Sequence, residues 1–181
     1  ARSSGLSAKR VSETRTTLAQ VVETTDANFL GKAFGGSILA MIDLCAYATS
    51  SKFAGTLCVT ASFDRVDFHE PIEVGDLVTL EGYISFVGRT SMEVTITLFS
   101  ENLLQGTRRH TNTARVTMVA IQEGKPVEVP RLICETREDK LAFLAGKMRR
   151  ERRQMHRAEF DKILSEMESF SDEKLDQLLS A

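Results

Sequence analysis

A single carboxylate in an apolar helix is the first residue of this chain that could do chemistry. The segment AFGGSILAMIDLCAYATSS spans residues 33–51, and Asp43 is its one charged residue. Asp has poor helix propensity and a buried charge is costly to desolvate, so an acid here needs a partner or a function. Asp43 could act as a proton acceptor or as a nucleophile. A structural ion pair or a cap on nearby backbone is the alternative, and the helix alone leaves both open.

Two glycines and an amide lie just before this carboxylate. Gly35 and Gly36 open the helix, where N–H groups are unpaired and the dipole is positive, so either N–H could hold a developing oxyanion. A tight turn into the helix would use the same glycines and is compatible with that role. The amide of Asn28, in the preceding loop, could bind a carbonyl or an attacking water, or only satisfy its own loop.

Hydrophobic periodicity predicts the elements that must position these residues. Apolar residues at helical spacing predict a buried helix over residues 33–51, and alternation predicts five strands, one before the helix and four after it. The helix stripe comprises Ile38, Leu39, Ile42, Leu44, Cys45 and Ala46. The strands cover residues 15–22, 56–68, 77–87, 91–100 and 108–121. Alternation places two sets of residues each on one side of its strand, Val78, Leu80, Ile84 and Phe86 on one strand and Met92, Val94, Ile96 and Leu98 on the next. Because no helical crossover separates the last four strands, they should be antiparallel, which predicts an α+β fold with an antiparallel sheet wrapped around one central helix.

The composition changes sharply near Pro130 and predicts three parts. Residues 1–15 should be a flexible N-terminal arm, residues 16–133 the compact domain, and residues 134–181 a helical C-terminal extension. A long helix is expected from about Glu135 to Phe170, followed by a short one capped by Ser171.

Composition also excludes several classes of function. The chain of 181 residues has 42% hydrophobic and 27% charged residues and a net charge of −2, which predicts neither nucleic acid nor membrane as a partner. Its three cysteines lack metal-ligand spacing and its start lacks a signal-peptide core, so we expect reduced thiols, no metal and a cytoplasmic location. No G-x-S-x-G elbow is present, and neither Cys45 nor Cys58 has a nearby His, which argues against a serine or cysteine acyl-enzyme.

Three motifs in order resemble one known family. TTDANFLGKAFGGSILAMID, DFHEPIEVGD and VGRTSMEV are similar to the loop-and-helix, strand-end and hairpin signatures of hotdog-fold acyl-CoA thioesterases of the cytosolic acyl-CoA hydrolase type. The resemblance covers about residues 15–121. It implies a hotdog fold and hydrolysis of acyl-CoA to free fatty acid and coenzyme A, without any cofactor beyond the coenzyme A of substrate and product.

The resemblance also implies roles for particular residues. The family's catalytic acid falls at Asp43, acting either as general base or as the nucleophile that forms a transient anhydride. The turn comprising Gly88, Arg89, Thr90 and Ser91 would bind coenzyme A phosphates, although a plain hairpin turn is the alternative, and Thr60 would border the pantetheine channel. Hydratases of the hotdog fold carry an Asp-His pair in the loop before the helix and at the start of the helix. Residues 24–36 of this chain contain no His, which argues against dehydration chemistry.

Assembly is the last implication of the resemblance. The family forms dimers whose sheets join edge to edge, and trimers of such dimers are common. Asp43 of one chain would then act with Asn28 and Gly35 of the other, although an arrangement within one chain is not excluded. The competing functions are a non-catalytic acyl-CoA binding or sensing protein on the same fold, and an assembly protein.

Overall fold

The computed structural model describes residues 6–64, 66–68 and 70–180. Its elements, in chain order, are β1 (Lys9–Arg10), η1 (Val11–Thr14), β2 (Thr16–Val21), η2 (Thr24–Asp26), α1 (Gly35–Ala54), β3 (Leu57–Phe63), β4 (Leu77–Val87), β5 (Ser91–Asn102), β6 (Thr107–Gln122), β7 (Lys125–Pro126), β8 (Leu132–Ile133), α2 (Arg137–Met167) and α3 (Asp172–Leu179).

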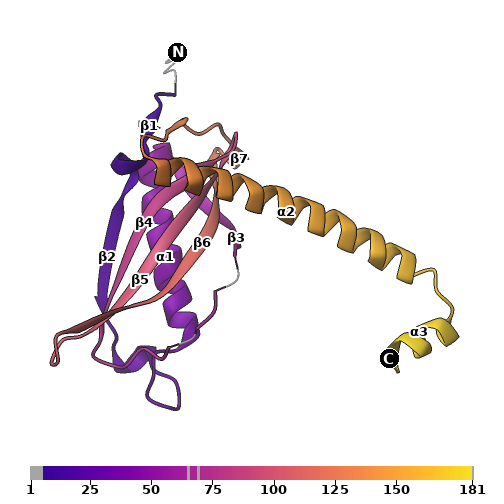
Figure 1. Ribbon diagram of the computed structural model, residues 1–181, viewed down its shortest axis with the longest axis horizontal. Helices are drawn as coiled ribbons and strands as arrows, with labels where there is room; N and C mark the ends of the chain where they lie inside the picture. Colours follow the sequence, from indigo (N-terminus) through magenta and orange to yellow (C-terminus); the bar gives the residue numbers. More distant parts are fainter. Residues whose placement is uncertain (1–5, 65, 69, 181) are drawn as a thin grey trace. The chain divides into compact units, whose positions relative to one another are not determined.

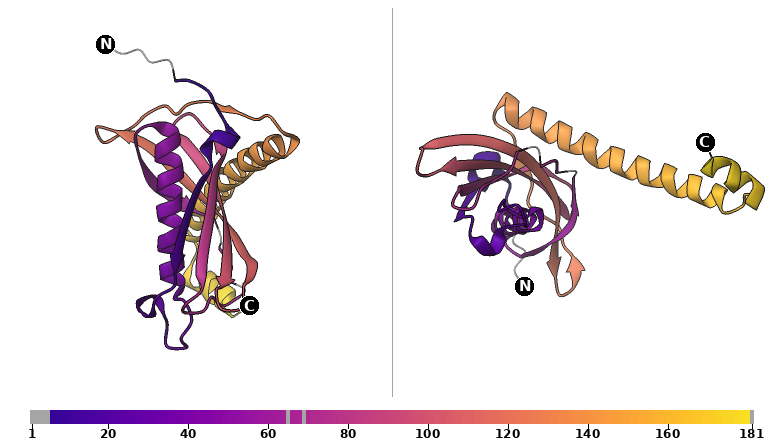
Figure 2. Two further views of the ribbon diagram at one scale, coloured as in Figure 1. Left: turned by 90° about the vertical axis from the view of Figure 1, so that its left-hand side faces the viewer. Right: turned by 90° about the horizontal axis from the view of Figure 1, so that it is seen from below.

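One antiparallel sheet carries the fold, and its strand order is β2-β4-β5-β6-β3 with β7 beside β6. The register pairs Leu80 with Leu98 between β4 and β5, and Thr60 with Met118 between β3 and β6. Both β2 and β3 are therefore edge strands of the path (Figure 1). The predicted α+β architecture is confirmed, with the sheet curled around α1 (Figure 2).

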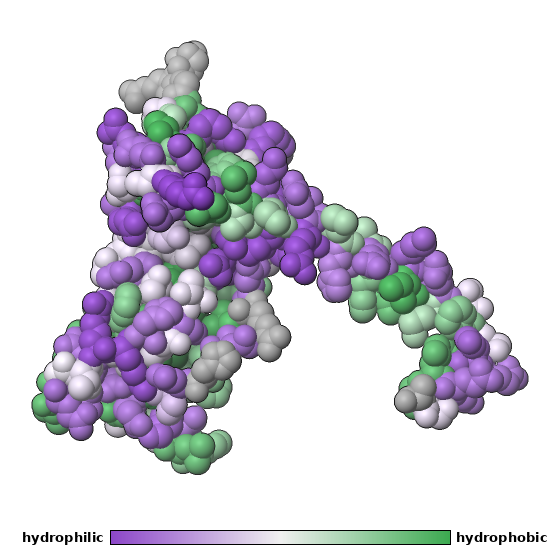
Figure 3. Space-filling view, in the orientation of Figure 1, coloured by the Kyte–Doolittle hydropathy of each residue, from purple (hydrophilic) through white to green (hydrophobic). Residues whose placement is uncertain are grey.

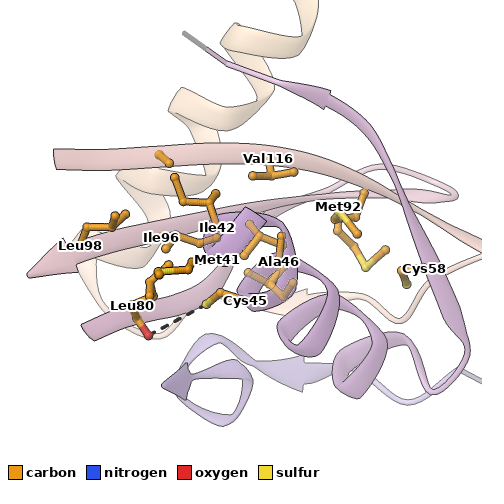
Figure 4. Close-up of a cluster of buried hydrophobic side chains, with 14 of the residues drawn as sticks. Met41, Ile42, Cys45, Ala46, Cys58, Leu80, Met92, Ile96, Leu98 and Val116 are labelled. Atoms are coloured by element: carbon orange, nitrogen blue, oxygen red, sulfur yellow. Dashed lines mark hydrogen bonds between the residues drawn. The ribbon is translucent and has the colours of Figure 1, made fainter. Parts of the chain in front are cut away.

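The core lies between α1 and the concave face of the sheet. Ile42, Cys45 and Ala46 of α1 are fully buried, and the Cys45 thiol lies 4.0 Å from the Leu80 carbonyl oxygen (Figure 4). The set predicted to share one side of β5 does so and faces the core: Met92, Val94, Ile96 and Leu98 are each at most 1% exposed. This packing fixes the rotation of α1 about its axis, and with it the direction of the polar residues on its other face.

Two expectations about the core were wrong. Leu44 is 58% exposed, so α1 is not buried on most faces within a single chain. Phe86 is buried, but it packs edge-on against Phe143 of α2 with ring centroids 4.9 Å apart, and the core receives Val87 instead. The cause is a β-bulge between Ile84 and Phe86, which reverses the alternation of side chains beyond it.

The N-terminal segment is more ordered than the sequence predicts. Lys9–Arg10 pairs in parallel with Leu132–Ile133, and Val11–Thr14 forms a 3₁₀ turn in which Val11 is 2% exposed. The expected flexible arm over residues 1–15 is therefore wrong for residues 9–14, because burial of Val11 and the pairing with β8 fix them. Residues 1–5 lie outside the described residues.

The chain divides into two compact units, residues 1–143 and 144–181. The second unit contains most of α2 and all of α3, and the Ser171 hydroxyl accepts from the Lys174 N–H at 3.4 Å, as expected of the predicted cap. Among the described residues, no helix combines the length and apolar character needed to cross a bilayer.

Candidate active site

The loop that leads into α1 is closed by its own polar groups. Asn28 Oδ1 accepts hydrogen bonds from the N–H groups of Leu30, at 2.9 Å, and Lys32, at 3.1 Å. The Phe34 N–H donates to the Asp26 carbonyl at 2.6 Å, which fixes the chain where the helix begins. The oxygen of Asn28 is thus committed to the loop, so the Nδ2 donor is the part of this side chain that a substrate can use.

The first turn of α1 offers two backbone donors. Ser37 and Ile38 both direct their N–H groups to the Phe34 carbonyl, at 2.9 and 3.3 Å. No acceptor binds the N–H of Gly35 or Gly36 within the described part of the chain. These are the positions where the first N–H groups of a helix lack intrahelical partners and the dipole is positive, so both can stabilise a negative charge.

A pocket of about 420 Å³ adjoins these donors and is lined by Asn28, Gly35, Ile38 and Phe68, among others. A Cβ on Gly35 would meet only the Phe68 ring, at 3.8 Å, so this end of the helix is open to a ligand. Sequence reasoning missed Phe68 as a pocket residue, because it lies in a segment expected to continue β3. Phe29, in the loop before α1, is fully exposed. Hydrophobic surface lies among polar surface at the lower end of the first unit (Figure 3).

Asp43 lies about two turns beyond the two glycines along α1, on the side that borders β3. Its Oδ1 accepts a hydrogen bond of 2.5 Å from Thr60 Oγ1, and Thr60 lies 3.5 Å from the sulfur of Met118. The side chain is half-buried rather than enclosed in the core as expected, because α1 turns this face away from the concave sheet. No ion pair between Asp43 and a Lys or Arg is found among the described residues, so the Thr60 hydroxyl holds the carboxylate, which stays partly exposed.

The structure therefore collects the predicted site residues into two groups. Asn28, Gly35 and Gly36 surround the start of α1, whereas Asp43 and Thr60 lie together midway along it. At 1.5 Å per residue, about 10 to 12 Å of helix separates the glycine N–H groups from Asp43. One chain does not bring all five residues to a single point.

The predicted phosphate turn joins β4 to β5. The Gly88 N–H donates to the Ser91 carbonyl at 2.8 Å, and the Arg89 side chain is 78% exposed, with Nη1 3.8 Å from Glu128 Oε1. Thr60 and the Ser91 end of β5 lie two strands apart, which is about 10 Å across the sheet. The turn is thus nearer to Asp43 and Thr60 than sequence separation suggests.

The cysteines take no part in this arrangement. Burial raises the pKa of the Cys45 thiol to about 11 and also raises the pKa of Cys58, so both are protonated at neutral pH. The described residues contain no group of three or more His, Cys, Asp or Glu placed to hold a metal.

Known proteins resemble this chain in both sequence and fold. Residues 30–107 match the family model of the thioesterase superfamily. YkhA of Bacillus subtilis, an uncharacterized acyl-CoA thioester hydrolase, is 41% identical over 63% of this chain and 67% of its own length. A solved apo-hexameric acyl-CoA thioesterase is 42% identical and covers 84% of this chain and 99% of its own, with a TM-score of 0.79. The acyl-CoA hydrolase of Staphylococcus aureus, solved with butyryl coenzyme A and coenzyme A, is 31% identical, covers 89% and 99%, and has a TM-score of 0.77. The chain therefore belongs to the thioesterase superfamily, in its group of hotdog-fold acyl-CoA thioester hydrolases.

Proposed function

We propose that the protein hydrolyses acyl-CoA thioesters to a free fatty acid and coenzyme A, in a site built from two copies of the chain. The observation that carries the proposal is the pairing of Asp43 with Thr60 at one place on α1 and the two free N–H groups of Gly35 and Gly36 at another. Related acyl-CoA hydrolases support the substrate class.

Distance argues that the two groups belong to different chains. An oxyanion bound by the glycine N–H groups sits beyond the start of the helix, about 12 Å or more from Asp43. A base that acts through one water must lie within about 7 Å of that oxygen, given the carbonyl bond, the attack distance and one hydrogen bond. Asp43 of one copy would therefore serve the carbonyl bound by Gly35, Gly36 and the Asn28 amide of its partner.

The exposed edge of the sheet supplies a surface for such a partner. Leu57, Val59 and Phe63 of β3 are between 41% and 54% exposed, and Leu44 and Tyr47 of the adjoining helix are 58% and 46% exposed. An unpaired edge strand with apolar neighbours needs a cover, and pairing β3 with its copy would provide one. A hexamer, as in the related apo-hexameric thioesterase, is the assembly we propose.

The reaction uses only groups of the chain, water and the substrate. Asp43 either takes the proton of a water that attacks the thioester carbonyl, or attacks that carbonyl itself to give an anhydride that water then cleaves. In both routes the C–S bond breaks, the thiolate of coenzyme A leaves and is protonated, and the N–H groups hold the oxyanion. No bound metal or cofactor is required. A cytoplasmic location, and the absence of nucleic-acid and membrane partners, stay predictions from the sequence.

Release of free thiol from a panel of acyl-CoAs of different chain length tests the proposal. The parent should turn over, and Asp43→Asn should lower kcat by about 10² to 10⁴, the usual contribution of a general base. Asp161→Asn, which removes an exposed acid of α2, is the matched control and should leave the rate unchanged. Binding of acyl-CoA without turnover by the parent would instead make the chain a binding or sensing protein.

A further inference from the structure

The turn between β4 and β5 has every one of its central carbonyl groups bound from outside the turn. The Gly88 carbonyl accepts from Arg131 Nη2 at 2.6 Å, and the Arg89 carbonyl accepts from the Val129 N–H at 3.0 Å. The Thr90 carbonyl accepts from the Ala120 N–H at 3.0 Å. The turn closes through the Gly88 N–H, which donates to the Ser91 carbonyl at 2.8 Å, whereas its own carbonyl groups are held by other segments of the chain.

The fixed carbonyls also fix the direction of the N–H groups. A peptide unit is planar and trans, so the N–H of the next residue points opposite to each bound carbonyl. Holding the carbonyls of Gly88, Arg89 and Thr90 thus directs the N–H groups of Arg89, Thr90 and Ser91 away from the groups that bind them. Those of Arg89 and Thr90 have no acceptor among the described residues. Successive free N–H groups beside a cation and hydroxyls form a concavity suited to an anion.

Of the three groups that hold the turn, one is a side chain. Arg131 Nη2 bridges the Gly88 carbonyl and the Val129 carbonyl, at 2.6 and 3.0 Å. Its backbone is itself anchored, because the Lys9 N–H donates to the Arg131 carbonyl at 2.9 Å where β1 begins. The guanidinium therefore links the segment before β8 to the turn through two hydrogen bonds.

We propose that Arg131 is a positioning residue that holds the Gly88–Ser91 turn in the conformation that binds the diphosphate of coenzyme A. This rests on the proposed function for its ligand. The phosphates are contacted by the turn's N–H groups, its hydroxyls and the exposed Arg89 side chain, whereas Arg131 acts through the Gly88 carbonyl. Sequence reasoning assigned Arg131 no role, because it lies about forty residues from the turn.

Two substrates that share an acyl group separate this role from a general effect on the fold. Acyl-CoA carries the phosphates, and the matching acyl-pantetheine thioester carries the same reacting carbonyl without them. Arg131→Ala should raise KM for acyl-CoA about tenfold, equivalent to about 1.4 kcal/mol, and leave kcat within about twofold. KM for acyl-pantetheine should not change. Arg131→Lys should recover part of the loss, because an ammonium can still donate to the Gly88 carbonyl.

Arg108→Ala is the matched control, since Arg108 is also exposed but lies at the other end of β5 and β6, over the Phe99 ring and 3.6 Å from Glu81. It should leave both KM values unchanged. Equal rises for both substrates, or no rise for acyl-CoA, would overturn the assignment to Arg131. Calorimetric titration of the parent and of Arg131→Ala with coenzyme A separates this inference from the proposed function. If the parent binds coenzyme A through an Arg131-dependent turn but does not hydrolyse acyl-CoA, this inference stands and the proposed hydrolysis is wrong. Failure of the parent to bind coenzyme A would remove both.

Discussion

The hydrogen bond from Thr60 to Asp43 makes a quantitative prediction. Thr60→Val removes the hydroxyl and keeps the shape of the side chain, including its contact with Met118. A hydrogen bond to a charged group contributes about 1.5 to 3 kcal/mol, and the lower end applies because Thr60 is exposed in a single chain. About 1.5 kcal/mol corresponds to a roughly tenfold loss in kcat, which thiol release from acyl-CoA under saturating substrate would measure.

The same change in a second background tests the reason for the loss. If Thr60 acts by orienting the carboxylate, Thr60→Val should have little effect when Asp43→Asn has already removed the charge. Thr60→Ser, which keeps the hydroxyl, should stay within about threefold of the parent. A tenfold loss in both backgrounds would show that Thr60 acts on substrate independently of Asp43, and no loss in the parent would show that this hydrogen bond does not matter to the reaction.

Three further predictions concern the core and its thiols. Gly82→Ala should lower the free energy of unfolding by about 1 to 3 kcal/mol in urea, because its Cβ would lie 2.7 Å from Thr49 Oγ1 and 3.0 Å from Cys45 Sγ; an unchanged midpoint would contradict this packing. Burial raises the pKa of Cys45 from 9.0 to about 11, so the folded state holds this proton more tightly than the unfolded state. This proton therefore contributes about 3 kcal/mol to the free energy of unfolding below pH 9, and the contribution is lost as the pH rises towards 11. Cys45→Ala should lose less stability than the parent over that interval. Equal losses of the free energy of unfolding, measured by urea titration, would refute the argument. At pH 8 a thiol reagent should modify the half-buried Cys134 before the buried Cys45 and Cys58, and equal rates by peptide mass spectrometry would count against their burial.

Much of the fold could be predicted because its patterns are local. The alternation in LVTLEGYISFV gives β4 its observed bounds, Leu77–Val87, and the apolar spacing around Ile42 gives α1 its buried stripe. Ser171 and the acids after it identify the start of α3. These signals depend only on side-chain periodicity and on the unpaired N–H groups of a helix start, which a sequence displays directly.

The failures concern long-range contacts. The bulge after Ile84 has no sequence signature, so strict alternation predicts the wrong face for Phe86. The exposure of Leu44 follows from a surface that one chain leaves uncovered, which helix periodicity cannot distinguish from core. Arg131 reaches the turn because the Val129 N–H binds the Arg89 carbonyl and β8 pairs with β1, which are contacts between segments far apart in the sequence.

The candidate site, like the fold, could be predicted from the sequence only in part. Residue type and position predict Asp43, Asn28 and the two glycines, since a carboxylate, an amide and a helix start each have definite chemistry. Their separation along α1 is a matter of helix geometry once the bounds Gly35–Ala54 are known. What a single chain cannot display is the partner that would bring the two groups together.

Mixing two inactive variants measures that shared site directly. Asp43→Asn keeps the acceptor for Thr60, and Asn28→Asp keeps the acceptor for Leu30 and Lys32 while removing the Nδ2 donor, so both should fold. In randomly reassembled symmetric dimers about half are mixed, and a site shared between chains leaves one of the two sites in each mixed dimer intact. Thiol release by the mixture should then recover to about a quarter of the parent rate per chain. Activity that stays at the residual level of the separate variants would contradict a site shared between two chains.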